Sequence, residues 1–170
     1  MSRLILLGRG PSKGECTFNY ETWATATLLL DPEWRDKPYS KLFMVDWKPE
    51  NLVMEVLRIA KERNIPVVSP HSHRIAGTES YPVFDVIEHF NANYLRNTAS
   101  YMLALALYQG YEKLYIYGLD VNGDVDYLVN RSYITFWLGV ATGMKVPYKL
   151  GGESLDWMYA SGKAKNKYMT

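Results

Sequence analysis

A glycine-rich turn follows the first aliphatic run of the chain. The run RLILLG covers residues 3–8, and the turn GRGPS continues it. Gly8 and Gly10 permit positive φ angles and a close approach of the backbone to a ligand. Arg9 adds a positive charge and Ser12 adds a hydroxyl, and exposed N–H groups in such a turn form a nest for anions. Two interpretations stay open on these residues alone, a phosphate or nucleotide site and a plain strand-to-loop turn.

The turn matches neither of the two common glycine-rich phosphate motifs. The dinucleotide pattern G-x-G-x-x-G needs glycine at position 13, where this chain has Lys13. A P-loop needs Gly-Lys-Ser or Gly-Lys-Thr at its end, and the turn lacks that ending. Any nucleotide bound here would therefore be held by a different arrangement.

A second group of polar residues lies at the end of the run KLYIYGLD, residues 113–120, and in the segment that follows it. Asp120 ends that run and is either a ligand-facing carboxylate or a cap for N–H groups in the next loop. Tyr127, Asn130 and Arg131 lie between this loop and the following helix, where they either reach a ligand or form a solvated helix start. These residues make a second candidate wall for a site.

The remaining residues with metal or thiol chemistry carry weaker signals. His71 and His73 form an H-x-H pair, but the sequence offers no evident third ligand, so we expect loop histidines and no metal site. Cys16 is the one cysteine, which rules out an intramolecular disulfide and fits a cytosolic setting. We expect its thiol to be a bystander.

Composition predicts an ordinary soluble protein. The 170 residues are 48% hydrophobic and 22% charged, with a formal net charge of +1, so bulk charge gives no support for nucleic acid as a partner. No apolar run is long enough for a membrane span or a signal peptide, and we expect a cytoplasmic protein. We predict one domain, residues 1–160, and a basic C-terminal tail, 161–170. The many aromatic residues leave a homo-oligomer open.

Hydrophobic periodicity predicts alternating strands and helices. Expected strands cover residues 3–8, 21–30, 41–47, 65–70, 113–120 and 145–150. Expected helices cover residues 49–64, 81–91, 97–110, 131–143 and 154–162. This alternation implies parallel pairing through right-handed crossovers, so we predict an α/β fold, a single Rossmann-like three-layer sandwich with a mostly parallel sheet. Ligands in such folds bind beyond the C-terminal ends of the strands, which is where the turns described above would lie.

Two stretches together resemble a known family. LLGRGPS and NTASYMLALALYQGYEKLYIYGLDVNG resemble segments of the small bacterial sialyltransferases of glycosyltransferase family 42 and related Rossmann proteins. The layout looks closest to that of short phage-encoded proteins. In the sialyltransferases the turn and the helix start hold a CMP-sugar donor. The resemblance assigns that role here to Gly8, Arg9, Gly10, Ser12, Asn97 and Thr98, and a helix start with hydroxyl caps suits an anion.

The chain departs from the family at functional positions. Arg9 stands where the family usually has asparagine, and Thr25 or Ala26 stands where a second donor-binding asparagine would fall. The family's histidine base has no counterpart, because no histidine follows His89, and Tyr127 lies near the matching place. A tyrosine with a pKa of about 10 is a poor base at neutral pH. The acceptor-binding lid of a full-length enzyme is missing too.

We therefore expect a nucleotide- or nucleotide-sugar-binding protein that needs no further cofactor and is a diverged glycosyltransferase if it is catalytic. In that case Asp120 or Tyr127 would orient the acceptor, and N–H groups around Gly10 and Thr98 would hold the phosphate. Two alternatives remain open. One is a non-enzymatic phage protein that sequesters a nucleotide in the host cytoplasm. The other is a structural or assembly protein that reuses the fold.

Overall fold

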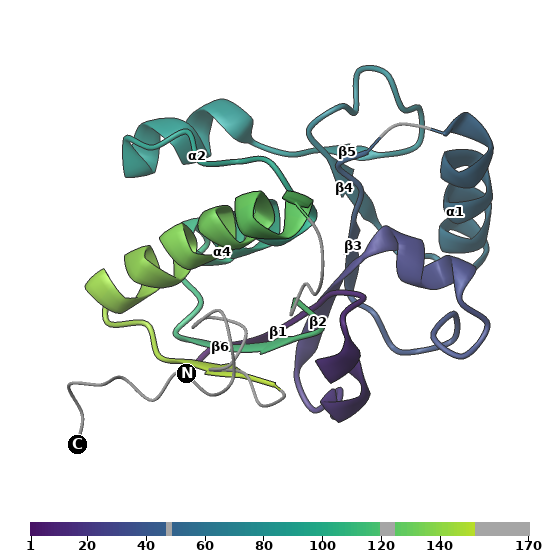
Figure 1. Ribbon diagram of the computed structural model, residues 1–170. Coiled ribbons are helices and arrows are strands. Elements are labelled where there is room, and N and C mark those ends of the chain that lie inside the picture. Colours follow the sequence, from purple (N-terminus) through teal and green to yellow (C-terminus); the bar gives the residue numbers. More distant parts are fainter. Residues whose placement is uncertain (47–48, 120–124, 152–170) are drawn as a thin grey trace.

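A parallel sheet forms the middle layer of the computed structural model, which describes residues 1–46, 49–119 and 125–151 (Figure 1). The sheet has seven strands in the order β5-β4-β3-β2-β1-β6-β7, and every pairing between them is parallel. The strands are Arg3–Leu7 (β1), Glu21–Thr25 (β2), Lys41–Phe43 (β3), Val67–Ser69 (β4), Glu79–Ser80 (β5), Lys113–Tyr117 (β6) and Tyr148–Leu150 (β7). The predicted parallel pairing is confirmed.

The first strand is buried on both faces, as its unbroken aliphatic sequence predicts. Leu4 and Leu6 point into one core, and Ile5 and Leu7 point into the other. All four side chains are fully or almost fully buried. Because successive residues of a strand face opposite sides, β1 joins the two cores.

Helices cover both faces of the sheet and complete the three layers (Figure 1). One core is closed by α2 (Val83–Phe90), α3 (Thr98–Tyr108) and α4 (Val125–Gly143). The other is closed by α1 (Glu50–Glu62) and the 3₁₀ segment η2 (Ala26–Leu30). A further 3₁₀ segment, η1 (Pro11–Glu15), follows the turn after β1. Residues on every side of α3 are buried, because it packs against both the sheet and α4. The predicted single α/β Rossmann-like sandwich is therefore confirmed.

Several predicted boundaries were wrong. The run 21–30 is not one strand, because β2 ends at Thr25 and the chain then turns into η2, whose Leu28 and Leu29 are buried in the α1-side core. Apolar runs do not distinguish a strand from a buried 3₁₀ turn. The helix predicted over 131–143 begins six residues earlier, at Val125. Sequence analysis missed β5, because its two residues are exposed and polar.

The C-terminal predictions fall outside the described residues. These are the helix over 154–162 and the basic tail over 161–170, so the division into 1–160 and 161–170 stays a prediction. Within the described ranges, no helix combines the length and the apolar character that crossing a bilayer requires.

Two glycines join the loops that follow β1 and β6. The Gly8 N–H donates to the Tyr117 carbonyl at 2.8 Å, and the Gly10 N–H donates to the Gly118 carbonyl at 2.7 Å. A Cβ on Gly8 would lie 2.2 Å from the Gly118 oxygen, and a Cβ on Gly118 would lie 2.4 Å from the Gly8 oxygen. Gly118 also has a φ of +65°, which favours glycine. The two backbones can therefore meet only where both residues lack a side chain.

We predict that Gly8→Ala lowers the free energy of unfolding by about 3 kcal/mol, because the new methyl group meets backbone atoms that cannot swing away. For a chain of this size the melting temperature should fall by roughly 6–12 °C in calorimetry. Gly139→Ala in α4 is the matched control, since open space surrounds that position. It should raise stability by about 0.5–1 kcal/mol. Equal melting temperatures for the two variants would contradict this contact.

Candidate functional site

The order of the strands reverses beside β1. From β1 the chain moves outward through β2, β3, β4 and β5, and it then returns to place β6 and β7 on the other side of β1. In open parallel sheets such a topological switch point leaves a crevice at the C-terminal ends of the strands. Here the Gly8–Gly118 contact lies at that crevice, so it sets the position of both loops around it.

A cavity of about 530 Å³ opens at this switch point, and we call it the switch-point cavity. Its volume lies in the range of sites that hold small molecules. Segments distant in sequence meet around it, namely the turn after β1, the end of β2, the start of α3, the end of β6 and one side of α4. The described lining residues are Gly8, Arg9, Gly10, Pro11, Thr25, Asn97, Thr98, Ala99, Met102, Gly118, Leu119, Asn130 and Ile134.

The N-terminus of α3 opens onto this cavity. Asn97 caps the helix, since its Oδ1 accepts the Ser100 N–H at 2.8 Å while the Ser100 hydroxyl accepts the Asn97 N–H at 3.2 Å. The next two residues, Thr98 and Ala99, both line the cavity. Their N–H groups belong to the first turn, which has no intrahelical acceptor for them. The helix therefore presents two donors and its positive pole to the cavity.

The cap also ties α3 to α4. The Asn97 Nδ2 donates to the Asn130 carbonyl at 3.1 Å and to the Asn130 Oδ1 at 3.2 Å. One amide side chain therefore satisfies the helix start and holds the neighbouring helix beside it. This explains how Asn130 comes to line the same cavity as Thr98.

Arg9 is the cation among the described lining residues of the switch-point cavity. Its side chain is exposed, and within the described part of the chain it forms no ion pair. Lys13 in the same segment differs, because its Nζ lies 3.5 Å from the Asp31 carboxylate and 5.2 Å from the centre of the Trp34 ring. The described lining contains no aspartate, glutamate, histidine or cysteine. The described wall is therefore positive or neutral and suits an anion.

The predicted site residues divide into three groups. Gly8, Arg9, Gly10, Asn97, Thr98 and Asn130 all line the switch-point cavity. Two others lie off its wall. Ser12 is buried, and its Oγ accepts the Gly118 N–H at 2.7 Å, so it fixes the loop after β6. Arg131 lines a separate groove with Tyr94 and Phe136 on the next face of α4.

The third group holds the two predicted catalytic residues. Asp120 lies outside the described residues, and Tyr127 belongs to α4 although its side chain lies outside the described part. The expected role of the Gly10 N–H needs correction as well. That group donates to the Gly118 carbonyl, so it is not free to hold a phosphate.

Sequence reasoning missed the apolar floor of the cavity. Ala99, Met102, Leu119 and Ile134 line it, and in the sequence they look like ordinary core residues of a helix or strand end. Thr25 lies on the wall because η2 turns the chain away directly after it. The sequence could have indicated Thr25, because it lies at the end of β2, where the resembled family has a donor-binding residue.

Burial suppresses the acidity of the nearby thiol and phenol groups. Burial raises the pKa of the Cys16 thiol, and it also raises the pKa of Tyr117, which precedes Gly118. Both groups are therefore protonated at neutral pH, and Cys16 gains no thiolate character that would suit a nucleophile.

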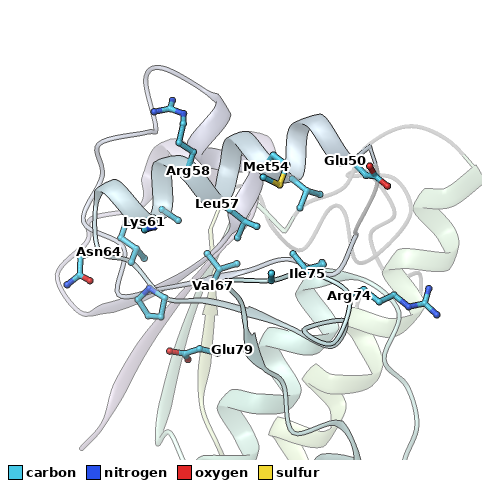
Figure 2. A pocket seen from close by; sticks show the side chains of 16 residues that line it. Glu50, Met54, Leu57, Arg58, Lys61, Asn64, Val67, Arg74, Ile75 and Glu79 are labelled. Atoms are coloured by element: carbon cyan, nitrogen blue, oxygen red, sulfur yellow. The ribbon is translucent and has the colours of Figure 1, made fainter.

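A larger cavity of about 1150 Å³ lies elsewhere, between α1 and the connection from β4 to β5. Figure 2 shows Leu57 of α1 pointing toward Val67 and Ile75 across it, with charged side chains at its margins. None of the described residues of the two resembling motifs lines this groove. The histidine pair lies in the same connection, and the described residues hold no cluster of three metal-ligating side chains.

No protein-family model matches the chain, and no curated protein matches its sequence. Solved structures share its fold at low identity. The sialyltransferase CstII from Campylobacter jejuni in complex with the substrate analogue CMP-3FNeuAc aligns with a TM-score of 0.66 and 14% identity over 91% of this chain and 82% of that one. Its complex with cytidine-5'-monophosphate gives a TM-score of 0.59 over the same shares of both chains and the same identity.

A second enzyme also shares the fold. Thiamine pyrophosphokinase from Bacillus subtilis aligns with a TM-score of 0.52 and 15% identity, over 88% of this chain and 60% of that one. At these identities the likeness establishes a Rossmann-like architecture. Any chemical function has to be argued from the residues of the site itself.

We predict that Asn97→Ala costs about 1–2 kcal/mol of unfolding free energy, because it removes both the cap of α3 and the link to α4. Asn130→Ala should cost less, since the Asn130 carbonyl still accepts from Asn97. Asn93→Ala serves as the control, as that side chain is exposed, and it should stay within about 0.5 kcal/mol of wild type. Urea unfolding curves measure all three. An Asn97→Ala variant as stable as Asn93→Ala would rule out this role.

Proposed function

We propose that this protein binds a nucleotide or a nucleotide-sugar in the switch-point cavity. One observation carries the proposal: both segments that resemble the sialyltransferases, the turn after β1 and the start of α3, wall the same cavity. The anionic part of the ligand would lie against the Thr98 and Ala99 N–H groups, where a helix N-terminus favours a phosphate. The apolar floor around Met102 and Ile134 would contact the base or the ribose.

The fold neighbours support the same class of ligand. CstII has been solved with cytidine-5'-monophosphate and with CMP-3FNeuAc, so a cytidine nucleotide is the first ligand to test on this chain. The proposal does not require a shared donor, because Arg9 and Thr25 give this cavity its own polar groups.

A nucleotide-binding role without chemistry is the second candidate. It is favoured by the described wall, in which no side chain can act as a general base near neutral pH. Under the transferase proposal, Asp120 or Tyr127 would orient the acceptor beside the cavity, as the sequence suggests. Turnover of the bound ligand separates the two roles.

We expect nucleotides of the preferred base to raise the melting temperature of the wild-type protein, since a ligand that binds only the native state stabilises it. Thr98→Trp should abolish the shift or weaken affinity at least about tenfold, because an indole at this position covers the first turn of α3. Thr135→Trp is the matched control, as Thr135 lies exposed on α4 in the separate groove. A panel of CMP, UMP, GMP and AMP with their nucleotide-sugars that shifts neither protein would refute the proposal.

For the transferase role, water can replace the acceptor: incubation with the nucleotide-sugar that binds best should transfer the glycosyl group to water and release free nucleotide and free sugar, which chromatography detects. Asp120→Asn should then reduce release at least about a hundredfold while nucleotide affinity stays within about threefold, since the carboxylate would act on the acceptor. Binding without release by the wild-type protein would assign the non-enzymatic role instead.

A further inference from the structure

We infer that the switch-point cavity prefers a ligand with two linked phosphates, a nucleoside diphosphate or its sugar derivative, over one with a single phosphate. This rests on the proposed function and names the ligand class of the same site. The inference follows from two positive groups that different elements contribute to the cavity lining, the first turn of α3 and Arg9.

The first positive group is the start of α3. Thr98 and Ala99 line the cavity, and the Asn97 cap leaves their N–H groups unused while it satisfies that of Ser100. Two adjacent N–H groups at a helix N-terminus bind one phosphate. The single phosphate of a nucleoside monophosphate would need only this group.

The second positive group is Arg9 on the turn after β1. The turn is held in place by the Gly8 and Gly10 hydrogen bonds to the end of β6, so the backbone of Arg9 has a fixed position in the cavity lining. Its guanidinium carries a permanent charge and a planar fork of donors that matches phosphate oxygens. Lys13 is occupied by Asp31, so among the described residues of this turn Arg9 is the cation available to a ligand.

The described wall adds no competing negative charge. It contains no carboxylate, so a second phosphate would meet no repulsion from the described side chains. A diphosphate can therefore contact both positive groups at once, one phosphate at α3 and the other at Arg9. In this arrangement Arg9 sets the preference for the number of phosphates.

Calorimetric titration at low salt in EDTA tests the inference with the monophosphate and diphosphate of cytidine, uridine, guanosine and adenosine. EDTA removes free divalent cations, so the affinities report on protein charges. For the preferred base, the wild-type protein should bind the diphosphate at least about tenfold more tightly, because a hydrogen bond between charged groups contributes that much. Inorganic pyrophosphate should compete with the diphosphate, though more weakly, since it lacks the contacts of the base.

Arg9→Gln should bring the ratio of diphosphate to monophosphate affinity close to one, with little change in monophosphate affinity. Arg9→Lys should restore part of the ratio, because it keeps the charge without the planar fork. Lys61→Gln, which removes an exposed cation from α1, should leave the ratio unchanged. Arg9 is exposed, so these variants should unfold at the wild-type temperature.

Three results would overturn the inference, and they are distinguishable. Equal affinity for both phosphate classes in the wild-type protein would refute the preference while leaving nucleotide binding intact. A ratio unchanged by Arg9→Gln would refute the role of Arg9. Failure of all eight nucleotides to bind would refute the proposed function and this inference together.

Discussion

The backbone contact between Gly8 and Gly118 is the constraint on which the site depends. Strands β1 and β6 are neighbours in the sheet although β2, β3, β4 and β5 lie between them in the sequence. Their loops can approach closely only because neither glycine has a side chain. The Ser12 hydroxyl then accepts the Gly118 N–H and fixes the loop after β6. The main structural role of the glycine turn is therefore to let the loops after β1 and β6 pack against each other at the switch point.

This explains how a structural turn and a binding turn can be the same segment. The Gly10 N–H, which a phosphate nest would need, is used inside the protein. Among the described lining residues, the first-turn N–H groups of α3 and the Arg9 side chain are donors that a ligand can use. Asn97 organises the α3 part of this arrangement, since it caps the helix and holds Asn130 of α4 beside it. The site thus has a frame of backbone hydrogen bonds, with Arg9 as the exposed cation among its described lining residues.

Sequence analysis predicted the architecture well because the strands are buried and strongly aliphatic. The pattern of β1 and the helix over 97–110 were clear signals, and both lie close to their predicted places. Errors arose where local pattern and tertiary context disagree. The segment Ala26–Leu30 is as apolar as a strand, yet it forms a 3₁₀ turn whose leucines pack in the α1-side core. Two exposed polar residues form β5 only because β4 offers them a paired edge.

The candidate site was predictable in part for similar reasons. Glycine turns and helix caps have recognisable sequence patterns. Six of the predicted binding residues do line the cavity. Side-chain direction was not predictable, which is why Ser12 faces the protein interior and Arg131 faces a separate groove. Neighbouring residues on a helix point in different directions, and here Asn130 lines the switch-point cavity while Arg131 lines the separate groove. The apolar floor gave no signal, because its residues also suit an ordinary core.

The central claim is that a nucleotide binds at the switch point. The most direct measurement is a titration of the ¹⁵N-labelled protein with the best-binding nucleotide, followed by two-dimensional NMR of the backbone amides. We predict that the largest chemical-shift changes fall on the amides of Arg9, Thr98, Ala99 and Asn130. The amides of Leu57 and Ile75, which line the larger cavity beside α1 (the α1 groove), should keep their chemical shifts. Shifts that cluster in the α1 groove, or no shifts at saturating nucleotide, would contradict it.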